Sequence, residues 1–320
     1  MPSPKHPTLQ PEWRDLLRYQ HGAFSRRQAL AFGVTDAVTS AQLKAHRWQR
    51  LYPGTFVAHN SRIEFRTRAW AAVLCCGGTA LASHRTAAYL AGLLDQPPGV
   101  LEVSVPAARR PRGAAGIVVR RRRLELSCVA SPPRTTIEDT VLDLIDQARQ
   151  ADEVVALLTA ACQRRLSTAA RLVAALARRQ KLRWRPLVCE VLDDGEGVHS
   201  PLEWRYLRDV ERAHGLPRAD RQTAGMRGRS KKWRDVHYRK YRLVIELDGA
   251  AAHPEERRHR DMARDNGIVV EGQAVLSYGW HDVAGTPCGA AEQVVVVLKA
   301  RGWDGVPRRC GPDCTLRGPF

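Results

Sequence analysis

The feature that most constrains this chain is a pair of short segments, toward its C-terminal end, in which acidic and apolar residues alternate. The segments are 233–238, Trp-Arg-Asp-Val-His-Tyr, and 243–249, Leu-Val-Ile-Glu-Leu-Asp-Gly. Successive side chains of a strand point to opposite faces of a sheet. We therefore predict two strands in which Asp235, Glu246 and Asp248 share one face, while Leu243, Ile245 and Leu247 are buried on the other.

The register of this predicted hairpin depends on its turn. A two-residue turn at Arg239-Lys240 places Asp235 opposite Val244 and diagonal to Glu246. Diagonal neighbours on one face lie about 7–8 Å apart, close enough for both carboxylates to share one ion. A longer turn that shifts the register by an even number of residues keeps the same face.

Crowded carboxylates repel one another unless a cation lies between them, so the acidic face predicts a metal site. Two simpler interpretations stay open: the acids form a solvated edge, or they pair with neighbouring arginines. Another acid, Glu203, follows Ser200-Pro201 in the pattern of a helix N-terminus, where it can complete a capping box. Glu203 is therefore either a cap residue or a further ligand from a helix.

The overall charge of the chain points to a polyanionic partner. The 320 residues include 51 Lys and Arg against 33 Asp and Glu, which gives a formal net charge of +18. Such a surface favours DNA, although a solubilising surface without a ligand is the alternative. No apolar run reaches the roughly 20 residues that span a bilayer, and the N-terminus lacks the apolar core of a signal peptide. We expect a cytoplasmic, nucleoid-associated protein with no membrane partner.

Eight cysteines are scattered along the chain, as expected in a reducing compartment. Only Cys310 and Cys314 have a spacing suited to chelation. A structural Zn²⁺ there needs two further ligands, for which Cys288 and His281 are the nearest candidates. The simpler interpretation is a pair of ordinary thiols.

The first sixty residues have the pattern of a winged helix-turn-helix. Ser25 and Gln28 fit a capping box, Gly33 ends that helix, and Thr35 or Asp36 can cap the next, which runs to about residue 46. A hairpin around residues 53–54 then forms the wing. A small helical cap without a ligand is the alternative. The residues that would face DNA are Arg26, Arg27, Gln42, Lys44, Arg47 and Arg50.

The rest of the chain suggests two further domains of mixed helix and strand. We predict an α/β multidomain protein with a winged-helix domain at 1–62, an α+β middle domain at 63–190, an α/β domain with a central mixed sheet at 191–305, and a tail at 306–320. In the middle domain His84 follows Ser83 at a predicted helix start. We interpret it as a structural or capping histidine, because no partner for base catalysis lies near it in sequence.

The N-terminal and middle regions resemble the AbiEi-type antitoxins of type IV toxin–antitoxin systems. The resemblance rests on Arg47-Trp48, Pro53-Gly54 and Phe56-Val57, and extends to the Ser-His-Arg-x-Ala-Ala stretch from Ser83 and to residues 133–136. It implies a winged-helix DNA-binding domain, a regulatory function, and a toxin or regulatory protein as a partner.

The C-terminal region, about 198–305, resembles the PD-(D/E)xK nuclease superfamily, in particular its branch related to very-short-patch-repair (Vsr-like) endonucleases. The resemblance implies a restriction-endonuclease-like fold that hydrolyses phosphodiesters with Mg²⁺ or Mn²⁺. Asp235 and Glu246 would hold the metal, Glu203 would add a ligand, and His253 would carry a proton or contact phosphate. The matching residues are 199–203, the Asp235 strand, 246–249, His253, 264–266 and Trp280.

One position departs from this family pattern. The superfamily has a lysine two residues after the second acid, and this chain has Asp248 there. Lysine orients water and offsets phosphate charge. Asp248 is therefore an extra metal ligand, or Arg264 or Lys240 supplies the charge, or cleavage is lost. The hypotheses are thus a DNA endonuclease, a non-catalytic antitoxin-like regulator with a degenerate nuclease fold, and a nuclease that acts on RNA.

Overall fold

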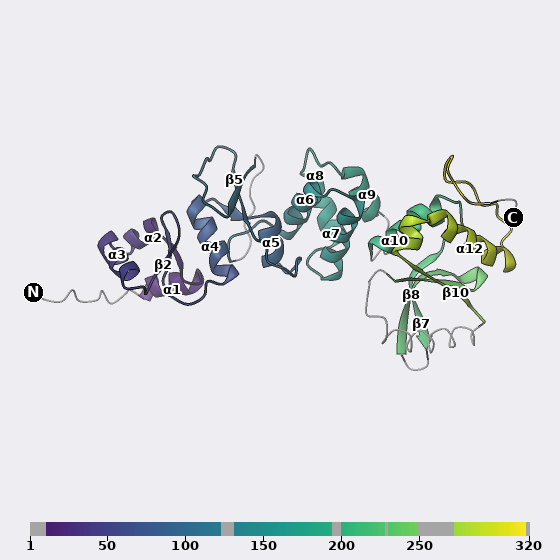
Figure 1. Ribbon diagram of the computed structural model, residues 1–320, viewed down its shortest axis with the longest axis horizontal. Coiled ribbons are helices and arrows are strands. Elements are labelled where there is room, and N and C mark those ends of the chain that lie inside the picture. The colour runs from purple at the N-terminus through teal and green to yellow at the C-terminus, as the bar shows by residue number, and fades with distance from the viewer. Residues whose placement is uncertain (1–10, 123–130, 194–199, 228–229, 249–271, 318–320) are drawn as a thin grey trace, which may run out of the picture. The chain divides into compact units, whose positions relative to one another are not determined.

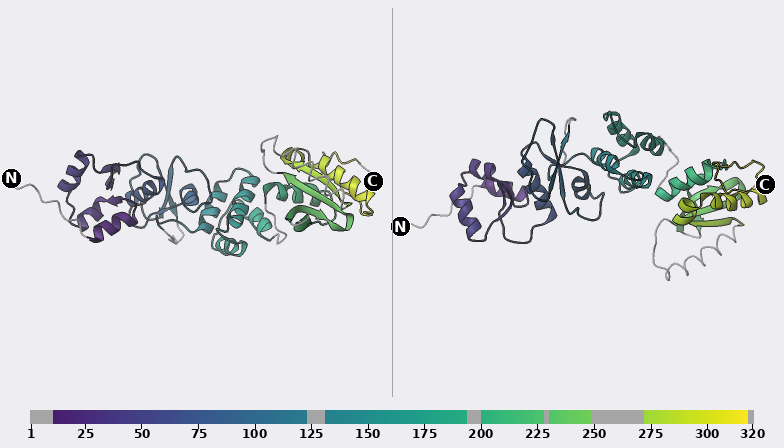
Figure 2. Two further views of the ribbon diagram at one scale, coloured as in Figure 1. Left: turned by 90° about the horizontal axis from the view of Figure 1, so that it is seen from below. Right: turned by 45° about the horizontal axis from the view of Figure 1, so that its top comes forward.

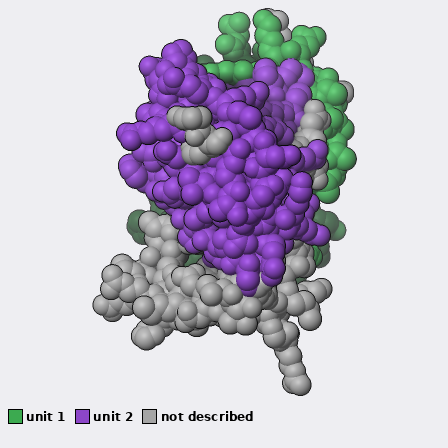
Figure 3. Space-filling model, turned by 90° about the vertical axis from the view of Figure 1, so that its right-hand side faces the viewer, with its two compact units in different colours: residues 1–148, 160–183 green, residues 149–159, 184–320 purple. Residues whose placement is uncertain are grey.

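The computed structural model describes residues 11–122, 131–193, 200–227, 230–248 and 272–317, and for 193, 222–227, 230–235 and 248 it describes the backbone alone. This part of the chain is a mixed α/β protein with three small sheets (Figure 1, Figure 2). It forms two compact units, 1–148 with 160–183 and 149–159 with 184–320 (Figure 3). The three domains and tail expected above stay a prediction.

The N-terminal region combines three helices with a small antiparallel sheet. The strand order is β1-β3-β2, so the hairpin predicted around residues 53–54 is confirmed and the strand before α2 joins it. The elements are α1 (Pro11–Tyr19), β1 (Ala23–Ser25), α2 (Arg26–Ala31), α3 (Asp36–Lys44), β2 (Gln49–Tyr52) and β3 (Thr55–Val57).

Local capping explains why α2 and α3 are separate helices. Ser25 caps α2 in a full capping box with Gln28, as predicted. Gly33 adopts φ 74°, a left-handed conformation that ends the helix at little steric cost. Thr35 then accepts a hydrogen bond from the Val38 N–H and starts α3. Gly33 and the N-caps Ser25 and Thr35 therefore determine the turn between the two helices.

A cluster of aromatic rings holds these elements together. Phe24 on β1 packs edge-on against Trp13 at 5.1 Å and Trp48 at 5.0 Å, and lies 5.5 Å from Phe56, all between ring centroids. These four side chains are buried. Aromatic pairs in this arrangement add to the stabilisation from area burial alone. Trp48 and Phe56, two residues that carry the antitoxin resemblance, therefore serve packing.

The middle region adds a second small sheet and several helices. Its strand order is β4-β5-β6, with β4 antiparallel and β6 parallel to β5. Thr136 and Thr168 cap α6 and α8 through their hydroxyls. The elements are α4 (Phe65–Cys76), β4 (Leu81–Ala82), α5 (His84–Leu90), β5 (Leu101–Pro106), β6 (Ile117–Arg122), α6 (Ile137–Gln147), α7 (Ala151–Gln163), α8 (Ala169–Ala177) and α9 (Arg185–Asp193).

The C-terminal region contains a four-stranded mixed sheet. The strand order is β10-β9-β8-β7; β7, β8 and β9 are antiparallel neighbours, and β10 runs parallel to β9. The elements are α10 (Pro201–Arg205), the π-helix η1 (Tyr206–Arg212), β7 (Asp220–Arg227), β8 (Ser230–Tyr238), the 3-10 helix η2 (Arg239–Tyr241), β9 (Leu243–Asp248), β10 (Ala274–Gly279), the π-helix η3 (His281–Gly285) and α12 (Pro287–Ala300).

Helices α10, η1 and α12 cover one face of this sheet (Figure 1, Figure 2). Leu202 and Tyr206 pack there against the apolar residues of β9, and the valines of α12 complete the core. The segment after α12 belongs to the same core, since Trp303 and Leu316 are buried in it. Cys314 and Leu316, from the segment expected to form a tail, are thus part of this core.

Candidate functional site

The β8–β9 hairpin has a longer turn than the two residues predicted. Val236 pairs with Ile245 and Tyr238 with Leu243, so η2 and Arg242 form the connection. The longer turn that the sequence left open is the one formed: residues 239–241 make a 3-10 turn, Tyr241 is buried in the core, and Arg242 follows at φ 50°. The register shift is even, so the predicted face is kept.

The described register of β8 and β9 runs from Tyr238–Leu243 to Val236–Ile245. Continued by one residue, it would set Asp235 on β8 opposite Glu246 on β9. Directly opposed residues have Cβ atoms about 4.5–5.5 Å apart, nearer than the diagonal arrangement predicted. The side chains of Asp235 and Asp248 lie outside the described residues, so their roles stay predictions.

Glu246 is a buried carboxylate in the middle of the sheet. Its side chain is only 5% exposed, while Leu243, Ile245 and Leu247 fill the core on the opposite face, as predicted. Ser277 of the parallel strand β10 is its Cα partner on the other side. Burying a carboxylate is costly unless a cation or hydrogen-bond donors compensate it. Glu246 is therefore a buried carboxylate on the face of β9 that the sequence predicts to be acidic.

Ser200 caps the helix in which Glu203 lies, as the sequence predicts. The Ser200 hydroxyl accepts a hydrogen bond from the Glu203 N–H at 3.1 Å, and Pro201 is the first helical residue. The Glu203 side chain is 6% exposed. Helix α10 packs on the apolar face of β9, whereas strand alternation puts Glu246 on the other face. The role of Glu203 as a further ligand of the acidic site therefore stays a prediction.

Neither cation proposed to replace the family lysine is placed beside the acids. Arg264, like His253, lies outside the described residues. Lys240 belongs to η2 at the end of the hairpin, where its ammonium lies 5.3 Å from the Tyr241 ring centroid. Glu246 is three residues into β9, about 10 Å of strand beyond the turn. Lys240 is thus a poor substitute for a lysine at position 248.

The basic residues of the N-terminal region are exposed but differ in what they contact. Arg26 forms an ion pair with Asp36, with the Nε nitrogen donating at 2.7 Å, which ties the start of α2 to the start of α3. This hydrogen bond lowers the pKa of Asp36. Arg50 lies 5.6 Å from the Phe56 ring centroid. Both arginines therefore have structural contacts within their own region.

Three further residues of the predicted DNA-facing set lie on or beside α3. Lys44 and Arg47 are exposed at its C-terminal end, and Gln42 is half-buried and accepts backbone hydrogen bonds from the following turn. Arg27, by contrast, reaches the loop after α4: its Nη2 nitrogen would lie 3.3 Å from a Cβ on Gly78. Lys44 thus lies at the end of α3 and Arg47 in the turn directly after it, both exposed.

The cysteine pair predicted as a chelate belongs to a larger cluster. Cys310 and Cys314 lie with Cys288, as the sequence suggested, but the fourth member is His214 instead of His281. His214 follows η1, and a separation of 74 residues from Cys288 gave no local signal for it. His281 starts η3 and lies outside this cluster because the helix turns its ring toward Gly285.

The sequence matches no family model and no curated protein. None of the helices in the described ranges has the combination of length and apolar character that crossing a bilayer requires.

Proposed function

We propose that this chain is a DNA-binding protein whose C-terminal unit hydrolyses phosphodiester bonds with Mg²⁺ or Mn²⁺. The observation that carries the proposal is the antiparallel pairing of Val236 with Ile245 inside a mixed sheet, a register that would set Asp235 opposite Glu246 when continued by one residue. Two carboxylates so close in the backbone, one of them buried, form a natural site for a hard divalent cation. Bound there, the metal would activate water and stabilise charge on a phosphate.

The N-terminal region supports DNA as the substrate. Its order of helix, strand, two helices and a hairpin, with all three strands in one sheet, suits a winged helix-turn-helix, in which α3 would enter the major groove. Lys44 and Arg47 would contact phosphates beside the groove. The mixed sheet of the C-terminal unit agrees with the restriction-endonuclease-like fold that the sequence resemblance implies.

The nuclease proposal is tested with supercoiled plasmid and a matched RNA. We expect the wild-type chain to nick or cut the plasmid with Mg²⁺ or Mn²⁺. Asp235→Asn and Glu246→Gln should each abolish cleavage while DNA binding persists, because each removes one metal-binding charge at nearly constant volume. Asp304→Asn, which changes an exposed acid in the C-terminal segment, is the control and should cut normally. Cleavage of RNA but not of the plasmid would show that the substrate is RNA instead of DNA.

The position of Asp248 favours a second candidate function. With aspartate in place of lysine and Lys240 held at the turn, the unit has less positive charge near the acids than the superfamily pattern supplies. A regulator that binds operator DNA without cutting it would tolerate this change. Tight, salt-sensitive DNA binding with intact plasmid in both metals would establish that function and reject the nuclease.

A further inference from the structure

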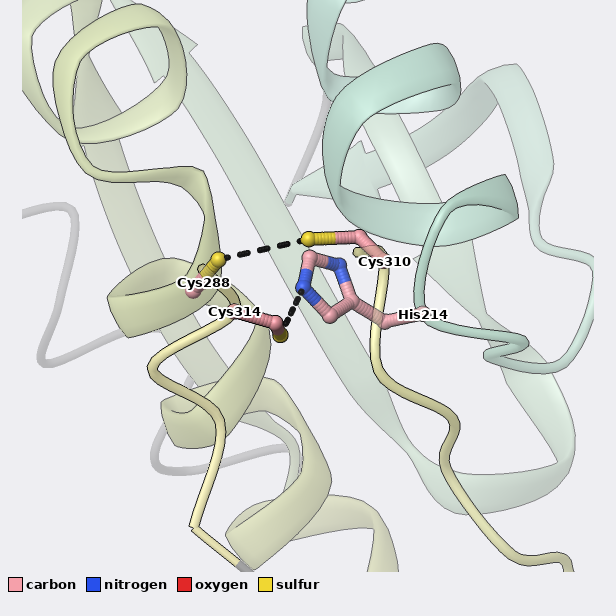
Figure 4. A group of neighbouring side chains, drawn as sticks. All are labelled: His214, Cys288, Cys310 and Cys314. Carbon is pink, nitrogen blue, oxygen red and sulfur yellow. Dashed lines mark hydrogen bonds between the residues drawn. The ribbon is translucent and has the colours of Figure 1, made fainter. Parts of the chain in front are cut away.

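Three cysteines and one histidine from distant parts of the sequence meet in the C-terminal unit (Figure 4). Their ligand atoms all lie within 4.8 Å of one another. The Cys288 and Cys310 sulfurs are 3.5 Å apart, and the Cys314 sulfur is 3.6 Å from the Nε2 nitrogen of His214. The four side chains point toward a common centre.

The Cys288–Cys310 and Cys314–His214 separations are close to those around a tetrahedral metal. With Zn–S bonds of about 2.3 Å and Zn–N bonds of about 2.0–2.1 Å, tetrahedral ligands lie about 3.8 Å apart for two sulfurs and about 3.6 Å for sulfur and nitrogen. Three thiolates and one imidazole are soft to borderline ligands that select zinc over magnesium or calcium. The cluster therefore differs in chemistry from the acidic site on β8 and β9.

The histidine is already oriented for coordination. His214 is fully buried, and its Nδ1 nitrogen lies 3.0 Å from the Val210 carbonyl oxygen. A carbonyl can only accept a hydrogen bond, so Nδ1 carries the proton and Nε2 presents its lone pair toward Cys314. This is the outer-shell arrangement by which proteins fix the tautomer of a metal-ligating histidine. It is an observation independent of the cysteines.

Two residues of the cluster, Cys310 and Cys314, belong to an irregular segment after α12. Residues 303–317 contain neither helix nor strand, yet they are held against the unit. The Arg308 backbone N–H donates to the His214 carbonyl at 2.9 Å, and its guanidinium donates to the Arg212 carbonyl at 2.6 Å. Cys314 is buried beside these contacts. A metal at this point would fasten the segment to η1 and α12 together.

We propose that His214, Cys288, Cys310 and Cys314 bind one structural Zn²⁺ that fixes the C-terminal segment to the helical face of the unit. All four positions are taken by protein, as is typical of structural zinc sites, so no open position is left for catalysis. The stabilisation would come from joining three segments that are 74 and 22 residues apart in sequence. The proposal is independent of the nuclease function.

Zinc content and cobalt spectroscopy of the reduced full-length chain test this proposal. We expect about one equivalent of zinc per chain. Replacement by Co²⁺ should give the intense visible bands of tetrahedral coordination and thiolate-to-cobalt charge transfer. Cys310→Ser changes an exposed side chain and should leave the core intact. It should nevertheless weaken zinc binding by more than the roughly 10- to 100-fold that loss of an outer-shell partner costs.

Two control variants make the assignment specific. Cys189→Ser removes a half-buried thiol of α9, and His281→Asn removes the histidine nearest in sequence to Cys288; both should keep the zinc and the cobalt spectrum. Chelation should speed tryptic cleavage at Arg308 and Arg309 in the wild type and in both controls. Reduced wild-type protein without zinc, or a cobalt spectrum unchanged in Cys310→Ser, would overturn the proposal. So would a Cys288–Cys310 disulfide in freshly isolated protein, seen as an intact mass lower by two hydrogen atoms.

Discussion

At the scale of single residues, the middle region is built around a buried charged cluster. Asp143 accepts hydrogen bonds from Arg122 at 2.8 Å and Arg179 at 2.7 Å, and Arg120 donates to Glu102 at 3.0 Å. Arg120 and Arg122, alternate residues of β6, thus form ion pairs within the protein. Buried carboxylates with such partners keep their charge without a metal. These arginines are therefore poor candidates for phosphate contact.

His84 lies within this cluster in a strained conformation. It has φ 49° at the first residue of α5, is buried, and lies 3.0 Å from the Ser83 hydroxyl through Nδ1. Burial lowers its pKa from 6.5, and the nearby Asp143 and Glu102 carboxylates only partly oppose this effect. The histidine is thus held neutral by its surroundings, in agreement with the structural role predicted for it.

The lowered pKa of His84 predicts a stability that depends on pH. The unfolded chain binds the proton more readily than the folded one, so the contribution of the neutral ring is complete above about pH 6.5 and is lost as the pH falls through the folded pKa. His84→Asn tolerates the left-handed backbone and does not titrate. The midpoint temperature of thermal unfolding should therefore fall less in this variant than in the wild type when the pH is lowered from about 7.5 to about 5.5.

The matched control for this prediction is His46→Asn. His46 has nearly the same backbone angle, φ 53°, but is exposed. Its replacement should leave the pH dependence of unfolding as in the wild type. Equal slopes for wild type and His84→Asn would show that the burial of His84 has no part in acid sensitivity.

At the scale of elements, a buried ion pair joins η1 to the edge strand β7 through the core. Arg221 donates to Glu211 at 3.0 Å with both side chains almost fully buried, and the Tyr238 hydroxyl donates to the same carboxylate at 3.3 Å. Burial raises the pKa of Glu211, although Arg221 opposes this effect. Burying two charges carries a large desolvation cost. Removing one partner of the pair therefore destabilises the fold more than replacing both partners with apolar residues.

Glu211→Gln should lower the free energy of unfolding by about 3 kcal/mol, because it removes the carboxylate charge that pairs with the buried Arg221 guanidinium. The control is Asp220→Asn, next to Arg221 on β7, which breaks an exposed ion pair with Arg239 at 2.8 Å. This change should lower the free energy of unfolding by no more than about 1 kcal/mol. The double variant Glu211→Leu with Arg221→Met should recover stability. Urea unfolding measures the free energy of unfolding of the three variants. Similar decreases for the two single variants would contradict this prediction.

Local signals in the sequence predicted much of this architecture and missed what depends on tertiary contacts. The caps at Ser25, Thr35 and Ser200 and the strand at 243–248 were readable because each depends on neighbours in the chain. Strand β7 was missed because its sequence, Asp-Arg-Gln-Thr-Ala-Gly-Met-Arg, lacks apolar alternation. In the candidate sites, the acidic face followed from alternation, whereas His214 joins its cluster only through folding.

At the scale of the whole molecule, the net charge is +18, but some of the cationic side chains already form ion pairs within the protein. Several arginines in both units are bound to acids, including Arg26, Arg179 and Arg221. Such pairs lower the number of cations that can release counterions from DNA on binding. The electrostatic attraction to DNA should therefore depend on exposed cations such as Lys44 and Arg47, which share one end of α3.

Double substitution of Lys44 and Arg47 by alanine should weaken duplex binding at every sequence and reduce the slope of log affinity against log salt by about 2, since each phosphate contact contributes about 1. A control that replaces exposed Arg112 and Lys181 removes the same charge from the middle region and should keep the wild-type slope. Arg26 is avoided because its loss would also break the pair with Asp36. Titrations at several salt concentrations measure both slopes. Equal slopes in the two double variants would remove α3 from the interface and leave only a diffuse attraction of net charge to DNA.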